Sequence, residues 1–305
     1  MSQFQQLRRE LAHRGLTPAA WVPEASGGRA EDVGIRPAEL VEGSTLAWRP
    51  VGAAEAWPGV VAFLDGTQHL ELVGYAGASP IFAAVLAAAV RERCDRRLAT
   101  AEFERRHVAI GRASALAAAG DALGSLEPVP IPDDEPPHPV RDTHAASRAL
   151  DRARGELEVR VGSRYRDRSD AWLVVDGSLA ESPAWSADEH MVGVAKSHAS
   201  LPFDGEDLER YLRLPAGHRS SIFTPASRSF APVRAWALRL WPWEGKDLFH
   251  GFVRVEVAPA LGEPDVADQL SRWLLAERAP MSAPDPRWDR LLYGVRSVET
   301  FLRAR

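Results

Sequence analysis

Cysteine is almost absent from this 305-residue chain. The single Cys94 excludes an internal disulfide and any cysteine-based zinc site, and it fits a reducing cytoplasm. Long hydrophobic runs are also missing, because the longest stretch of small apolar residues, 81–90, is too short to span a bilayer. The charged N-terminal segment MSQFQQLRRELAHRG lacks the apolar region of a signal peptide. The sequence therefore predicts a cytoplasmic protein with no membrane contact.

Lysine is nearly as scarce, with only Lys196 and Lys246 in the chain. The net charge is -5, so no global basic field attracts nucleic acid and any such contact must use local patches. Arginine suits bidentate phosphate contacts, although a GC-rich genome would produce the same preference for arginine. The sequence contains no Walker A motif, Gly-rich dinucleotide loop or G-x-S-x-G elbow, which leaves ATPase, dehydrogenase and α/β-hydrolase functions without support.

Hydrophobic residues make up 45% of the chain, enough for a sizeable core. Their pattern predicts an α/β domain over residues 58–305, preceded by an N-terminal helix and extended region at 1–57. Phe4, Leu7 and Leu11 give the first helix an apolar stripe that could serve a partner instead of the core. The expected strands are 60–64, 70–75, 171–175, 191–195, 219–224, 234–241 and 248–257. The expected helices are 3–14, 79–98, 142–165, 204–212, 264–279 and 288–304.

Two local predictions depend on turn chemistry. The strand at 60–64 runs into Asp65-Gly66-Thr67, which predicts a hairpin with the strand at 70–75. The stretch 126–139 is rich in proline, which predicts a loop or linker.

The most informative pattern is an apolar strand followed by Asp-Gly, which occurs twice. Asp65 lies in VVAFLDGTQ and Asp176 in WLVVDGSL. A buried strand delivers its last side chain to a fixed position at the sheet edge, and two carboxylates brought together there repel each other unless a cation lies between them. Mg²⁺ or Mn²⁺ fills that role and also binds phosphate oxygens. Taken singly, each Asp-Gly is more often an ordinary turn.

Two further residues extend this pattern. Glu158 lies at the margin of the apolar stripe of the helix at 142–165, from which it could point toward the aspartates or pair with Arg154 at i−4. Lys196 ends the strand at 191–195, where it could neutralise a phosphate or orient an attacking water, or could simply be solvated.

These segments together resemble the NurA nucleases. The resemblance lies in VVAFLDGTQ, RGELE at 154–158, WLVVDGSL followed by MVGVAKSH, and the later RSSIFTP, WALRLWPW and GFVRVEV. It spans roughly residues 58–304, and the order and spacing of the motifs are more specific than any one of them. It implies an RNase H-like mixed β-sheet flanked by helices, in which Asp65, Glu158 and Asp176 hold divalent metal, usually manganese.

The resemblance also implies a function and partners. These are a homodimer docked on a HerA-type hexameric ATPase, and cleavage of DNA ends during end resection, repair or anti-phage defence. The family commonly has a C-terminal Tyr and His near the metals. Tyr293 matches the first, but no His follows it, and Glu299 is the nearest polar candidate.

Several alternatives stay open at this level. Arg219 and Arg239 are candidates for DNA phosphate contact, which sets affinity but not sequence choice. Arg254 and Glu256 alternate on one strand face and are expected to pair with each other. The missing His favours a catalytically weakened DNA-binding or ATPase-docking subunit as the alternative function. A glycosidase using paired carboxylates is a more distant alternative.

Overall fold

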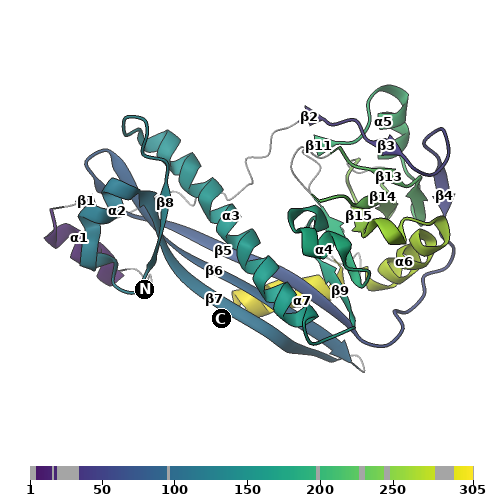
Figure 1. The fold of residues 1–305 in the computed structure, drawn as a ribbon, viewed down its shortest axis with the longest axis horizontal. Helices are drawn as coiled ribbons and strands as arrows, with labels where there is room; N and C mark the ends of the chain where they lie inside the picture. The colour runs from purple at the N-terminus through teal and green to yellow at the C-terminus, as the bar shows by residue number, and fades with distance from the viewer. Residues whose placement is uncertain are drawn as a thin grey trace. The chain divides into compact units, whose positions relative to one another are not determined.

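The structure, a computed structural model, describes residues 5–15, 17–18, 34–94, 97–196, 200–226, 231–243, 248–278 and 292–304. The chain folds into two compact units (Figure 1). The first unit comprises Met1–Ala30, Gly66–Ala88 and Phe103–Val161, and the second comprises Glu31–Asp65, Ala89–Glu102 and Gly162–Arg305. These boundaries do not coincide with the expected one after residue 57. Several long elements contribute residues to both units, so each unit is built from separate segments of the chain.

A mixed β-sheet forms the core of the second unit. Its strand order is β3-β13-β14-β15-β10-β9-β5. Strands β5, β9 and β10 are parallel to one another, whereas β15 runs antiparallel to β10. The bounds are β3 Glu39–Leu40, β13 Phe223–Thr224, β14 Arg234–Arg239, β15 Phe252–Val257, β10 Met191–Ala195, β9 Trp172–Val175 and β5 Val61–Ala76.

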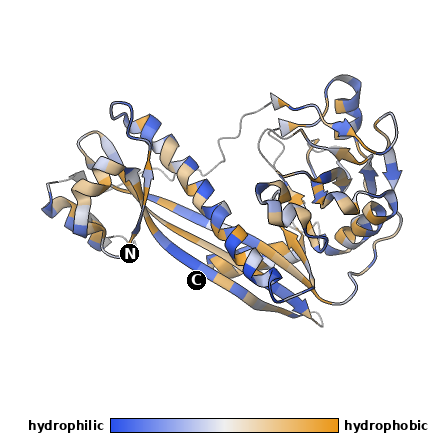
Figure 2. Ribbon diagram, viewed as in Figure 1, coloured by the Kyte–Doolittle hydropathy of each residue, from blue (hydrophilic) through white to orange (hydrophobic). Residues whose placement is uncertain are grey.

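Short strands and helices complete the second unit. Strand β12, His218–Ser220, pairs with β14 and with β4, Trp48–Pro50, and β11, Ser200–Leu201, pairs with β2, Gly34–Ile35. The helices are α4 Pro183–Ala187, α5 Gly205–Leu212, α6 Pro264–Glu277 and α7 Tyr293–Arg303. Hydrophobic residues concentrate in the strands (Figure 2), and those of β9 and β10 are almost fully buried. This burial on both faces accounts for their continuous apolar sequences.

The first unit contains the rest of β5 and three more strands, in the order β5-β6-β7-β8. These are β6 Ser79–Cys94, β7 Arg97–Arg112 and β8 Glu127–Ile131, and β1, Thr17–Pro18, pairs with β5. Helices α1 Gln5–His13, α2 Ala113–Ala119 and α3 Pro139–Arg166 accompany them. Leu7 and Leu11 of α1 are buried in a cluster with Val73 and Ile81, so the expectation that they serve a partner instead of the core is wrong for these two residues. Phe4 lies outside the described residues.

The hairpin expected at Asp65-Gly66-Thr67 is wrong. Strand β5 is continuous over 16 residues and passes straight through Asp65 and Gly66. The chain reverses instead at Gly77 and Ala78, where Gly77 has a φ of 60°, a left-handed conformation that glycine adopts without steric cost. Because a two-residue connection can join only antiparallel neighbours, β5 and β6 form the hairpin.

The helix expected at 79–98 is also wrong, because this segment forms strand β6. Its alanines favour a helix, but β6 lies between β5 and β7, and nearly every residue from Ser79 to Val90 is buried. An apolar run buried on both faces has no periodicity that separates a strand from a helix. The expected loop at 126–139 contains β8, whose Pro128 and Pro130 are tolerated because β8 lies at the edge of the sheet.

The predicted fold class is confirmed: the protein is α/β, with a large mixed sheet flanked by helices, an N-terminal helix and C-terminal helices. Strand β10 has the expected bounds, and α3, α5, α6 and β9 match their predictions within a few residues. Among the residues that the structure describes, no helix is both long enough and apolar enough to cross a membrane.

The packing of the C-terminal end of α3, residues 162–166 of the second unit, gives a first prediction. A side chain at Gly162 would lie 2.7 Å from the Trp185 ring and 2.9 Å from a methyl of Leu64. Alanine gains about 1 kcal/mol of helix propensity, but overpacking costs about 1–3 kcal/mol, so Gly162→Ala should lower the free energy of unfolding. Urea denaturation measures the change, and Ser163→Ala, the next position in the helix, is the control. A stabilised Gly162→Ala protein would contradict this packing.

Candidate active site

Asp65 and Asp176 follow the last paired residues of two neighbouring parallel strands. In β5 and β9, Leu64 pairs with Val175, and the backbone N–H of Asp176 donates to the carbonyl oxygen of Leu64 over 3.1 Å. Asp65 is the next residue along β5, and Asp176 is the first residue after β9. Because neighbouring strands lie about 4.8 Å apart, the register places the two residues at adjacent positions.

The two side chains also share one face of the sheet. Leu64 faces the α3 side, where it meets the position of Gly162, and Phe63 faces α7, where it lies against Gly294. Side chains alternate along a strand, so Asp65 lies on the same face as Phe63. Val175 shares its face with Leu64 through the parallel pairing, which places Asp176 on the α7 face with Asp65. Asp65 is only 8% exposed, so its charge is largely removed from water.

Lys196 supplies a positive charge to this pair. It follows β10, which is the other neighbour of β9, and its ammonium forms an ion pair with Asp176. Both side chains are partly buried, which strengthens their attraction relative to an exposed pair. Lys196 is therefore paired with Asp176, and its role in the reaction stays a prediction.

Glu158 belongs to the first unit, where its carboxylate is ion-paired with Arg154. It packs against Gly66, the residue bonded to Asp65, and any side chain at Gly66 would overlap the Glu158 carboxyl group. Arg154 also donates to Gln68 over 3.2 Å, and Gln68 donates to Asp151 over 2.8 Å. The i−4 pairing considered in the sequence is thus present, and Gly66 provides the space that Glu158 occupies.

The carboxylates partly fit the divalent metal that the family resemblance implies. Oxygen ligands of this type suit Mg²⁺ and Mn²⁺, and Asp65 and Asp176 supply two from adjacent strands. Among the described residues, however, no group of three or more His, Cys, Asp or Glu side chains is arranged to hold a metal ion. The carboxylates of Asp176 and Glu158 are bound by Lys196 and Arg154 instead. A metal would have to compete with both basic groups.

The C-terminal candidates lie on α7. Tyr293 is its first residue and is 58% exposed, next to Gly294, which packs on Phe63. Its phenol is accessible to a ligand from solvent. Glu299, the candidate in place of the missing histidine, pairs with Arg303 over 2.6 Å.

The structure does not support DNA contact by Arg219 and Arg239, because both are buried. The side chain of Arg219 is 1% exposed and is ion-paired with Glu42 over 2.6 Å and with Asp268 over 2.5 Å. Arg239 donates to the carbonyl oxygens of Leu212, Leu214, Leu248 and His250. These guanidinium groups link segments of the second unit, and neither is presented to a phosphate in solution.

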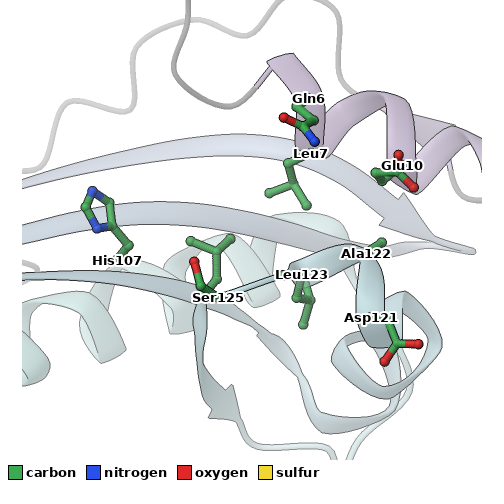
Figure 3. A pocket seen from close by; sticks show the side chains of 10 residues that line it. Gln6, Leu7, Glu10, His107, Asp121, Ala122, Leu123 and Ser125 are labelled. Atoms are coloured by element: carbon green, nitrogen blue, oxygen red, sulfur yellow. The ribbon is translucent and has the colours of Figure 1, made fainter.

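A pocket of 540 Å³ lies in the first unit, between α1, β7 and the 3-10 helix η1, Gly120–Leu123 (Figure 3). Gln6, Glu10, His107 and Asp121 are among the residues that line it. It includes none of the site residues that the sequence predicts.

Comparison with known proteins gives no family by sequence: no family model matches the chain, and no curated protein matches it. Among solved structures, the chain is similar to the NurA nuclease from Sulfolobus solfataricus, with a TM-score of 0.49 and 10% identity over 84% of this chain and 86% of that one. It is also similar to the catalytic domain of human Endonuclease V, with a TM-score of 0.35 and 13% identity over 98% of this chain and 95% of that one. These values do not show a family.

The burial of Arg219 gives a second prediction. Removing one partner of a buried ion pair leaves an uncompensated charge and costs about 3–5 kcal/mol, so Arg219→Ala should lower the free energy of unfolding by that amount. Arg49 pairs with the same Glu42 over 3.3 Å, but its side chain is 45% exposed, and Arg49→Ala should cost less than about 1 kcal/mol. Chemical denaturation followed by circular dichroism compares the two. Equal losses in both variants would refute the structural role of Arg219.

Proposed function

We propose that the protein is a divalent-metal-dependent deoxyribonuclease that hydrolyses phosphodiester bonds at DNA ends. The observation that carries the proposal is the pairing of β5 with β9, which puts Asp65 and Asp176 at adjacent positions on one face of the sheet. Two neighbouring carboxylates favour a cation between them, and Lys196 is a cation that pairs with Asp176. A site of this kind suits a divalent ion and a substrate that carries phosphate.

Each residue has a proposed task in this reaction. Asp65 and Asp176 would hold Mn²⁺ or Mg²⁺. Bound metal of this kind polarises phosphate oxygens and lowers the pKa of a coordinated water. Lys196 would neutralise charge on the scissile phosphate or orient the attacking water. Tyr293, with its exposed phenol, would donate a hydrogen bond to the DNA backbone.

Delivery of the DNA is a separate requirement. At a net charge of -5 the chain has no general attraction for nucleic acid, and Arg219 and Arg239 are buried. A partner that brings DNA to the site would meet this need. The resemblance to NurA nucleases supports a HerA-type hexameric ATPase as that partner and a homodimer as the assembly, acting in end resection, repair or anti-phage defence.

One alternative within the same class has support in the chain. No histidine follows Tyr293, so the site would lack a ligand common in the family, which favours a weakened nuclease acting as a DNA-binding or ATPase-docking subunit. Cleavage of linear DNA by the purified protein separates the two. The glycosidase alternative requires no metal, so inhibition by EDTA would exclude it.

Replacement of Asp65 tests the proposed function. Asp65→Asn keeps the size of the side chain but removes the charge that binds the metal, and we expect cleavage of linear DNA with Mn²⁺ to fall by about 100-fold or more. The control is Asp170→Asn. Asp170 is exposed and lies just before β9, at the opposite end of the strand from Asp176.

The two variants must differ for the proposal to stand. Asp170→Asn should cleave at the wild-type rate, and EDTA should abolish the activity of both the wild type and this control. Wild-type cleavage by Asp65→Asn, or cleavage that persists in EDTA, would rule out the assigned site.

A further inference from the structure

Glu256 is a buried carboxylate near the candidate site for which the sequence suggested no role beyond pairing with Arg254. It lies on β15 and is 1% exposed. Its Oε1 accepts a hydrogen bond from Arg254 over 2.9 Å. Its Oε2 accepts one from the Ser178 hydroxyl over 2.6 Å and one from the Leu179 backbone N–H over 3.0 Å. Both carboxylate oxygens of Glu256 are therefore engaged in hydrogen bonds.

Two of these donors belong to the turn that follows Asp176. Ser178 and Leu179 are 78 and 77 residues away from Glu256 in the chain, so the contact ties this turn to a distant strand. Ser178 also caps the short 3-10 helix at Leu179–Glu181 by accepting from Ala180. The turn is thus held at two successive residues by one carboxylate.

Gly177 and Gly193 allow the turn at 177–179 to lie against β10. Gly177 has a φ of 154°, at the margin of the region that favours glycine. A side chain at Gly193 of β10 would lie 2.8 Å from the Gly177 carbonyl oxygen and 3.2 Å from the Leu179 nitrogen. The turn therefore packs directly over β10, and a bulkier residue at 193 would displace it.

Glu256 lies on the opposite face of the sheet from Asp176. In the strand register Glu256 pairs with Gly193, and Gly193 pairs with Val175. Directly paired residues share a face, so Glu256 and Val175 point to the α3 side, whereas Asp176, one residue later, points to the α7 side. Glu256 can therefore affect the site through the backbone of the turn.

We propose that Glu256 is a positioning residue that fixes the turn at 177–179 and thereby the direction of the Asp176 carboxylate. Asp176 is the first residue after β9, and its position is set on one side by the strand and on the other by this turn. Arg254 of the second unit forms an ion pair with Glu256, with 2.9 Å between its guanidinium nitrogen and Oε1 of Glu256. The consequence for metal binding rests on the proposed function, whereas the anchoring of the turn does not.

Hydrogen exchange tests the anchoring alone. In Glu256→Gln the uncharged amide is a weaker acceptor, and we expect the Leu179 N–H to exchange at least about tenfold faster than in the wild type. If Glu256→Gln folds poorly, Ser178→Ala tests the same turn. It keeps the Glu256 carboxylate and removes the hydroxyl that donates to it. Glu263→Gln is the control, because Glu263 is exposed and follows the same strand. Unchanged exchange at Leu179 in both turn variants would overturn the proposal.

Titration of each protein with Mn²⁺ alone tests the effect on the site. Replacement of a residue that orients a ligand typically lowers metal affinity by about 10–100-fold, and we expect this loss in Glu256→Gln and wild-type affinity in Glu263→Gln. Wild-type affinity in Glu256→Gln despite faster exchange would overturn the positioning role. If the wild type itself binds no Mn²⁺, the proposed function fails, and the exchange result alone decides whether Glu256 anchors the turn.

Discussion

The candidate site depends on the parallel pairing of β5 with β9. The pairing of Leu64 with Val175, and the hydrogen bond from Asp176 to the Leu64 carbonyl, fix two acidic residues at adjacent positions. Lys196, which follows the next parallel strand, pairs with Asp176.

The fold was predictable where one strand or helix is defined by its own sequence. Strands β9 and β10 were found because each is a short apolar run that ends at a charged residue, and α3 because it has a long apolar stripe. Secondary structure was predicted wrongly where pairing with distant strands determines whether a segment is a strand, a turn or a helix. Asp65-Gly66 has the composition of a turn but lies inside a long strand, and the alanines of β6 favour a helix but are buried between two strands.

The site was predictable to the extent that its residues follow short apolar runs. Asp176 and Lys196 could be proposed because each follows the end of a buried strand, and Asp65 because it follows the apolar run of β5, although β5 continues beyond it. The role of Glu256 could not, since its partners on the Asp176 turn lie 77 and 78 residues away. The burial of Arg219 could not be predicted for the same reason: Glu42, its ion-pair partner, is 177 residues distant. No local pattern distinguishes a buried arginine from one that contacts phosphate.

The most direct test is the location of manganese in crystals grown with Mn²⁺, read from its anomalous scattering. We expect a peak on the α7 face of the second unit, within coordination distance of the carboxylates of both Asp65 and Asp176, with the Lys196 ammonium displaced from Asp176. Such a peak would establish that the paired strands create a metal site. Crystals that contain manganese but show no peak at these two carboxylates would contradict the account.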